Sequence, residues 1–243
     1  MTRIRYALGA CTFALLLWQG IVWLTGVPSF ILPSPVRVAQ AALDNRVLIA
    51  ENALVTATEV ILGLITGTVL GAFTAVQLAN SDRLHRLVMP LLIFTQAVPV
   101  FALAPILTLW FGYGIASKVV MAVLIIYFPV TSAFYDGLTR VPADILDMAK
   151  IMGGTKRQIM RRIKIPHALP SLGTGLKLAA VYAPIGAVIG EWVGASKGLG
   201  YLMLLANGRA KTDLMFASLF TLVVMTLLLS LAVTKASDYL SKP

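Results

Sequence analysis

The chain has few charged residues and a single cysteine. Only 12% of its 243 residues are charged, whereas about 25% is usual in soluble domains. Together with 58% hydrophobic residues and a mean hydropathy of +0.87, this excludes an ordinary soluble protein. The lone Cys11 excludes an internal disulfide and a cysteine-based metal site.

Motifs for ATP binding and for catalysis are also missing. The sequence contains no G-x-x-x-x-G-K-[ST] loop, so the chain has no phosphate loop of its own. His85 and His167 fall in polar loops without a partnered Asp, Ser or Cys, and neither is expected to be catalytic. We therefore predict a chain that is not an enzyme, with no catalytic residues, no metal site and no cofactor of its own.

The hydrophobic residues gather in runs of about 20, the length that crosses a bilayer as a helix. The first run follows Arg3 and Arg5 and has no A-x-A cleavage site, so it is expected to be a retained anchor rather than a signal peptide. We predict an all-α integral membrane protein with one domain over residues 1–243. About six transmembrane helices are expected, at residues 7–27, 53–79, 91–111, 119–134, 172–193 and 214–233.

The net charge of +10 is explained by membrane orientation rather than by nucleic-acid binding. With the N-terminus in the cytoplasm, roughly twice as many Lys and Arg residues fall on the cytoplasmic side as outside. Arg37, Arg46 and Lys118 are among those expected outside. We predict a multi-pass protein of a bacterial inner membrane with both termini in the cytoplasm.

Glycines recur at every fourth position in two of the predicted spans. This spacing clears one helix face, so that another backbone can approach closely. Such a face could pack statically within one subunit, or form a surface along which helices slide or subunits meet. The glycines are Gly63, Gly67 and Gly71 in the second span and Gly186, Gly190 and Gly194 in the fifth.

Two acids lie in apolar surroundings, where a charge normally faces protein or water. For Glu59 we favour a structural hydrogen-bonding role. Glu191, together with Gln96, Tyr127 and Tyr182, is a candidate for lining a translocation path. Prolines in the spans are expected to bend their helices and leave room for a cavity at Pro99, Pro105, Pro129 and Pro184.

The longest polar stretch, residues 136–170, is expected to form two short cytoplasmic helices. Pro142 can begin the first, and Gly153-Gly154 can end it. Thr155 can cap the second, which Pro166 and Pro170 are expected to terminate. The stretch could be a solvated basic loop, a helix–turn–helix for nucleic acid, or a helix presented to a cytoplasmic partner. Short tethers to the membrane on both sides argue against nucleic acid.

The same stretch resembles the loop motif of permeases of bacterial binding-protein-dependent ABC importers, E-A-A-x3-G-x9-I-x-L-P. Here it reads Asp147-Met148-Ala149, Gly153 and Ile163-Lys164-Ile165-Pro166, with identical spacing and three substitutions. The resemblance implies a type I importer permease with a coupling-helix loop. The residues it implies for contact with the ATPase are Asp147, Ala149, Gly153, Gly154, Ile159, Ile163 and Pro166.

Other segments resemble the sulfonate, taurine and nitrate branch of this family, namely Leu32–Pro35, the span with Gly63, Gly67 and Gly71, and Gly190–Tyr201. Within it, Gly190–Gly200 and Leu205–Arg209 are most similar to permeases for thiamine-pyrimidine precursors. The resemblance implies an ATPase dimer that binds ATP and Mg, a periplasmic or lipid-anchored solute-binding protein, and a second permease copy. The expected solute is hydroxymethylpyrimidine or formylaminopyrimidine, with alkanesulfonates, taurine, nitrate or riboflavin as alternatives.

Three other functional classes are weighed against the importer. An ion-driven secondary transporter would need several charges deep in its spans and usually an internal repeat. A membrane enzyme would need a polar catalytic cluster, and none is evident in the sequence. A membrane scaffold is a further alternative, and co-purification of a separate ATPase would distinguish the importer from all of these.

Overall fold

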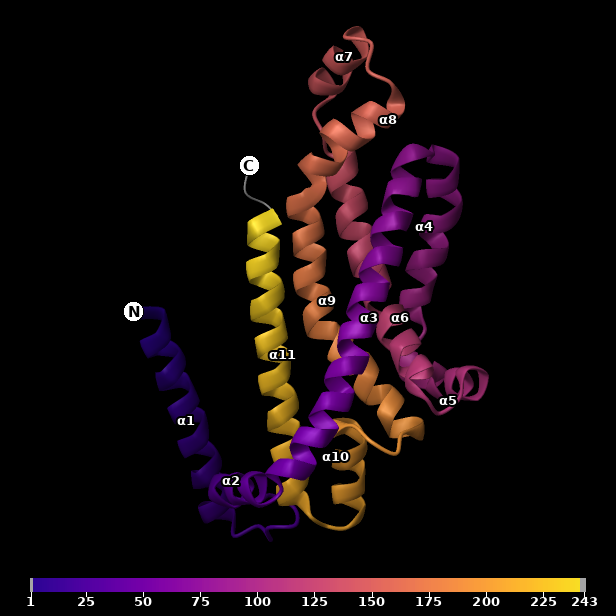
Figure 1. Cartoon of the computed structure of the whole chain (residues 1–243). Coiled ribbons are helices and arrows are strands. Elements are labelled where there is room, and N and C mark those ends of the chain that lie inside the picture. The colour runs from indigo at the N-terminus through magenta and orange to yellow at the C-terminus, as the bar shows by residue number, and fades with distance from the viewer. Residues whose placement is uncertain (1, 241–243) are drawn as a thin grey trace.

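A computed structural model describes residues 2–240, and within them every regular element is helical. Long helices run side by side, and shorter ones lie at both ends of the bundle (Figure 1). In chain order the elements are α1 (Thr2–Thr25), α2 (Pro35–Asp44), α3 (Arg46–Asn80), α4 (Asp82–Ala97), α5 (Val100–Phe111), α6 (Ile115–Thr139), α7 (Ala143–Ile151), α8 (Lys156–Ile159), the π-helical turn η1 (Met160–Lys164), α9 (Ile165–Gly194), α10 (Leu199–Gly208) and α11 (Thr212–Leu240).

Four of these helices are long and apolar enough to cross a membrane, namely Arg46–Asn80, Ile115–Thr139, Lys156–Gly194 and Thr212–Tyr239. A fifth crossing results if the bent pair α4–α5 counts as one span. The apolar part of α1, Thr12–Thr25, is shorter than these. The all-helical membrane fold is therefore confirmed, whereas the number of six spans stays a prediction.

The predicted span at residues 91–111 is wrong as a single helix. The chain turns by 100° between α4 and α5, at Val98 and Pro99. Pro99 has no N–H to continue the hydrogen-bond ladder, and the residue before a proline is driven into an extended conformation. Val98 has that conformation, with φ −88° and ψ 120°.

The expectation that Pro166 and Pro170 end the second loop helix is also wrong. The helix continues through both prolines, and Lys156–Gly194 forms one rod of 39 residues. The π-helical turn lies immediately before Pro166, and the N–H of Ile165 bonds to the Met160 carbonyl five residues back. Because the widened turn shifts the hydrogen-bond ladder there, a residue without an N–H can follow.

Helix α6 lies at the centre of the bundle, packed between α3 and α9. Gly63, Gly67 and Gly71 of α3 all face α6. A Cβ added at Gly63 would come within 2.6 Å of the Cβ of Ala122, closer than side-chain carbons pack. The glycine stripe of α3 thus allows close packing between helices of the same chain.

The stripe of α9 also packs against α6. A Cβ at Gly186 would lie 2.5 Å from the Cα of Ala122, and one at Gly190 would lie 2.9 Å from Cγ of Lys118. Gly194 approaches the turn that precedes α6. Both glycine stripes of the sequence therefore meet the central helix, and both approach it at Ala122.

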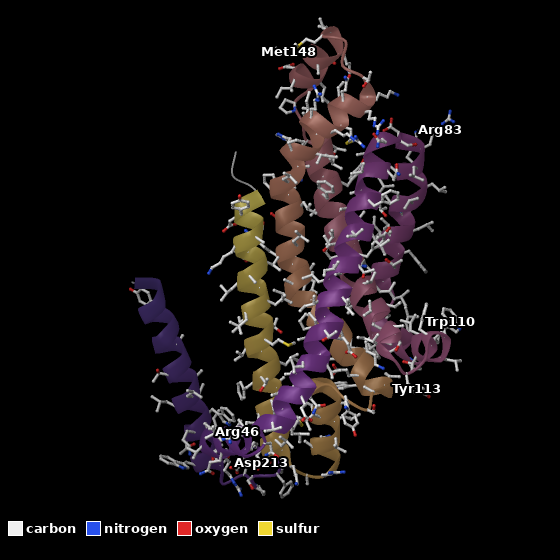
Figure 2. All side chains as sticks on the ribbon, in the orientation of Figure 1. Arg46, Arg83, Trp110, Tyr113, Met148 and Asp213 are labelled. Atoms are coloured by element: carbon white, nitrogen blue, oxygen red, sulfur yellow. The ribbon has the colours of Figure 1, made fainter. Side chains whose placement is uncertain are left out.

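The bundle has two different ends. We call the end that carries α7 and α8 the hairpin end, and the opposite end, which carries α2 and α10, the far end (Figure 1). The start of α1 and the finish of α11 both point toward the hairpin end (Figure 1). Arg46 and Asp213 mark the far end, and Met148 marks the tip of the hairpin (Figure 2).

Candidate functional site

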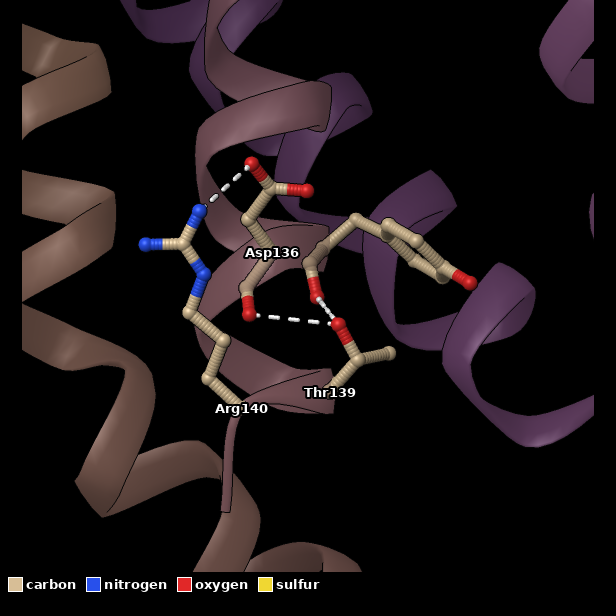
Figure 3. A network of polar contacts seen from close by, with 4 residues as sticks. Asp136, Thr139 and Arg140 are labelled. Carbon is tan, nitrogen blue, oxygen red and sulfur yellow. Dashed lines mark hydrogen bonds and ion pairs between the residues drawn. The ribbon is translucent and has the colours of Figure 1, made fainter.

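The hairpin begins where α6 ends. Arg140 closes the helix through a backbone bond to the Asp136 carbonyl (3.1 Å) and an ion pair with the Asp136 carboxylate (3.5 Å). The hydroxyl of Thr139 donates to carbonyls of the same turn at 3.0 and 3.2 Å (Figure 3). Pro142 then precedes α7, with Asp144 in the first turn near the positive end of the helix dipole.

The turn between α7 and α8 depends on two glycines with different roles. Gly153 has φ +78°, a left-handed conformation that side chains disfavour. Gly154 donates its N–H to the Ala149 carbonyl (2.9 Å), and a Cβ there would lie only 2.7 Å from that oxygen. The predicted helix end at Gly153-Gly154 is therefore present, and Gly154 requires a glycine because of crowding alone.

A capping box begins α8. The Thr155 hydroxyl accepts from the Gln158 N–H (3.3 Å), and the Gln158 side chain accepts from the Thr155 N–H (2.8 Å). The two bonds satisfy N–H groups that a helix start otherwise leaves unpaired. They hold α8 at a defined angle to the glycine turn.

Large apolar side chains are exposed at the tip of the hairpin. Ile151 is 87% exposed, Met152 79% and Met148 63%, and Met148 projects at the end of the molecule (Figure 2). Beside them lies a hollow of about 260 Å³ between α7 and α8. It is lined by Ala149, Met152, Gly153, Gly154, Gln158, Ile159, Arg162 and Ile163.

Most residues predicted to contact an ATPase lie at this hollow. Five of them line it: Ala149, Gly153, Gly154, Ile159 and Ile163. Asp147 is exposed on α7 and pairs with Lys150 (2.8 Å). Pro166 lies apart from the hollow, in the first turn of α9. The exposed Ile151 and Met152 at the tip were missed, although an apolar pair at the end of a polar loop was visible in the sequence.

The four predicted path residues do not converge in this single chain. Gln96 is exposed at the end of α4, and Tyr182 is 40% exposed on α9. The Tyr127 hydroxyl bonds to Thr74 of α3 (2.7 Å). None of the four lines the apolar groove of about 470 Å³ between α9 and α11.

Glu191 is buried in a polar cluster instead of facing open space. It is 1% exposed, and its carboxylate accepts from the Thr56 hydroxyl (2.6 Å) and the Gly200 N–H (2.5 Å). The Leu199 N–H donates to the Thr56 hydroxyl (2.8 Å), and the Gly198 N–H donates to the Asn52 side chain (2.8 Å). Helices α3 and α9 together hold the start of α10.

Lys118, one of the basic residues expected on the outer side, is buried in the bundle at 1% exposure. Its Nζ donates to the carbonyls of Tyr113 (2.5 Å) and Gly194 (3.2 Å), which lie before α6 and at the end of α9. The counting of basic residues could not reveal this burial, because Lys118 follows a polar turn. Sequence reasoning also missed Asn52 and Thr56, which look like ordinary polar residues near a helix start.

Glu59 lies beside this cluster and is 3% exposed. Its carboxyl group is close enough to the Glu191 carboxyl and to the Lys118 ammonium group to interact with both. The expected structural hydrogen bond is incomplete, because Glu59 Oε2 is buried without a hydrogen-bond partner. In the part of the chain that the structure describes, no group of three or more His, Cys, Asp or Glu residues could hold a metal.

Comparison with curated proteins finds several full-length relatives. A probable ABC transporter permease protein of Haemophilus influenzae is 47% identical over 88% of both chains. The formylaminopyrimidine transport permease protein ThiX of Halalkalibacterium halodurans is 37% identical over 99% of this chain and 97% of its own length. The riboflavin transport system permease protein RibX of Chloroflexus aurantiacus is 37% identical over 88% of this chain and 81% of its own length.

A solved structure supports the fold. A chain from an inward-facing conformation of the MetNI methionine ABC transporter superimposes with a TM-score of 0.72 at 20% identity. The match covers 82% of this chain and 99% of the other. Residues 67–242 match the family described as binding-protein-dependent transport system inner membrane component. That segment spans most of the bundle and the whole hairpin, and the chain belongs to this family of ABC importer permeases, which are transport subunits and not enzymes.

Proposed function

We propose that this chain forms the translocation path of an ABC importer for a thiamine-pyrimidine precursor, formylaminopyrimidine or hydroxymethylpyrimidine. The observation that carries the proposal is the end-to-end match with ThiX, which includes α1 and α2 as well as the family segment. RibX has the same identity over a smaller share of both chains. A thiamine-pyrimidine precursor is therefore the preferred solute, and riboflavin is the second candidate.

The hairpin is the proposed contact with the ATPase partner, which binds ATP and Mg in place of this chain. Three observations support this role: the exposed apolar tip at Ile151 and Met152, the adjoining hollow, and the rigid two-glycine turn. Exposed apolar side chains beside a concave surface are typical of a docking site. The polar rim is supplied by Asp147, Lys150 and Arg162.

The proposed orientation places the hairpin end in the cytoplasm and the far end outside. The start of α1 and the finish of α11 then lie on the cytoplasmic side, as the distribution of basic residues also favours (Figure 1). A periplasmic or lipid-anchored binding protein would deliver the solute at the far end. There α2 and the start of α11 form a polar surface with Arg37, Lys211 and Asp213.

A second copy of the chain is proposed to complete the path. Gln96 and Tyr182 are exposed in the single chain and could face a cavity only if another subunit covered them. ATP binding would then draw two hairpins together and rock the helices attached to them. ATP can drive this change only by stabilising one conformation of the complex more than the other.

Growth on trace precursors tests the substrate. A host unable to make the thiamine pyrimidine would express this chain with its ATPase and binding protein, and would be supplied with hydroxymethylpyrimidine or formylaminopyrimidine. Growth that is lost when this chain alone is deleted supports the proposal. Growth that is indifferent to the chain, with riboflavin uptake that depends on it, would move the assignment to the second candidate.

Gly153→Asp tests the docking role of the hairpin. Gly153 has open space around it, so the substitution should leave the protein in the membrane but abolish transport by disturbing the turn. Gly26→Asp is the matched control, because Gly26 also has positive φ (+58°) and open surroundings but lies outside the hairpin. Normal uptake by Gly153→Asp would contradict the assignment of the hairpin.

A further inference from the structure

The start of α10 is capped entirely by side chains from other helices. The three successive N–H groups of residues 198–200 donate to Asn52, Thr56 and Glu191 at 2.8, 2.8 and 2.5 Å. A helix start is normally capped by residues next to it in sequence. Here the cap belongs to α3 and α9, so the position of α10 depends on both.

The glycines of this segment make room for the Glu191 carboxylate. Gly198 has φ +118°, and a Cβ there would overlap the carboxylate. A Cβ at Gly200 would lie 2.8 Å from Glu191 Oε2. The carboxylate therefore occupies the space of two absent side chains, directly at the positive end of the α10 dipole.

Lys118 forms no ion pair with the neighbouring carboxyl groups. Within the described part of the chain, no carboxylate oxygen lies within 4.0 Å of Lys118 Nζ, which bonds to two backbone carbonyls instead. Glu59 Oε2 has no partner at all. A buried polar atom without a partner is unfavourable, so Glu59 would gain from a rearrangement that pairs it with Lys118.

We propose that Glu191 is the positioning residue of a latch at the far end of the translocation path. In this conformation the latch, formed by Asn52, Thr56 and Glu191, holds α10 against α3 and α9. During transport the latch releases α10, and Lys118 pairs with Glu59 as it leaves the two carbonyls. The inference deepens the proposed function and rests on it, because the release is driven by the ATPase partner.

Lys118 connects this latch to the rest of the bundle. Its two carbonyl acceptors belong to the turn before α6 and to the end of α9, so its withdrawal frees both. α9 also continues as one rod to the hairpin, from Gly194 back to Lys156. A displacement of the hairpin by the ATPase therefore reaches Glu191 through a single helix.

Thiol labelling of a buried reporter tests the latch. Ala206 of α10 is 2% exposed, and Ala206→Cys in a Cys11→Ser background gives a single thiol for a water-soluble maleimide. In the assembled importer, labelling should be slow at rest and at least tenfold faster after trapping with nucleotide and vanadate. Equal rates in the two states, while ATP hydrolysis proceeds normally, would overturn the latch and leave the proposed function intact.

Glu191→Gln provides the decisive variant. The amide carries no charge and its nitrogen cannot accept from the Thr56 hydroxyl, which would then donate only to the Asn52 carbonyl (3.3 Å). The bond from the Gly200 N–H also loses its charged acceptor, so the cap weakens and resting labelling should rise at least tenfold. Glu51→Gln is the matched control, because Glu51 is an exposed acid on α3 and its loss should leave the rate unchanged. This comparison needs only membranes that contain the chain, so it remains valid if no ATPase associates. Equal resting labelling rates in Glu191→Gln and Glu51→Gln would overturn the latch.

Two further variants separate release from unfolding. A second reporter, Ala168→Cys, is fully buried at the opposite end of α9 and should stay protected in Glu191→Gln. Thr56→Val removes the hydroxyl that joins Glu191 to Leu199 and should also raise Ala206→Cys labelling, with Thr58→Val on the exposed face as its control. Equal exposure of both reporters would show that Glu191 merely stabilises the fold.

Discussion

Gly186→Ala tests the close contact between α9 and α6. A Cβ at Gly186 would lie 2.5 Å from the Cα and 2.8 Å from the backbone nitrogen of Ala122. Neither atom can move without displacing α6, which also packs closely against α3. The substitution therefore requires the two helices to separate rather than a side chain to rotate.

The expected effect lies at the upper end of the range for overpacked cores. Such substitutions usually destabilise by about 1–3 kcal/mol, and a clash with backbone atoms leaves little room for relaxation, so we expect about 3 kcal/mol. For a chain of this size, about 1 kcal/mol shifts Tm by roughly 2–4 °C. Gly186→Ala should thus lower Tm by roughly 6–12 °C.

The shift in Tm is measured by heating the detergent-solubilised protein and using size-exclusion chromatography to determine the fraction that stays folded. The Tm of Gly67→Ala should fall between those of Gly186→Ala and wild type, because its Cβ would come within 2.7 Å only of side-chain atoms, Cδ1 and Cγ1 of Ile126, and not of backbone. Gly208→Ala has no neighbouring atoms within 4 Å and should leave Tm unchanged or slightly higher. If Gly186→Ala unfolds at the same temperature as Gly208→Ala, the close-contact argument is refuted.

Three further substitutions have distinct expected results. Ile151→Asp should weaken co-purification of the ATPase at least tenfold without changing Tm, because this 87% exposed side chain would lose about 1.5–3 kcal/mol of apolar burial on docking; unchanged binding would exclude Ile151 from the contact. Thr155→Val removes the hydroxyl that caps the Gln158 N–H and should destabilise the hairpin by about 1 kcal/mol, seen as faster hydrogen exchange around α8 and nowhere else. Lys177→Met breaks an ion pair with Asp238 (2.8 Å) whose side chains are 39% and 63% exposed, so the loss should stay below about 1 kcal/mol, and a Tm shift much larger than a few degrees would contradict this.

Much of the hairpin could be predicted because its signals are local. Pro142, Gly153-Gly154 and Thr155 act on the backbone within a few residues, and each begins, ends or caps a helix as expected. The continuation past Pro166 was not predictable from such rules. It depends on a π-helical turn, whose wider hydrogen-bond pattern no single residue signals.

The interior of the bundle could be predicted only in part. The four-residue glycine spacing indicated close helix contacts, but it did not say whether the partner was the same chain or another. The structure shows both stripes packed against α6 of the same chain. Charge counting placed Lys118 outside, because it treats a basic residue after a polar turn as solvated, whereas two carbonyls from separate segments bury it.

The sequence by itself determined the membrane class, the hairpin motif and the family, since these depend on composition and on short spacings along the chain. Only the tertiary structure decided which polar groups meet. Glu191 and Thr56 are 135 residues apart, and Gly198 and Asn52 are 146 apart. Such contacts arise from helix packing, which positions side chains in space without leaving a periodic pattern in the sequence.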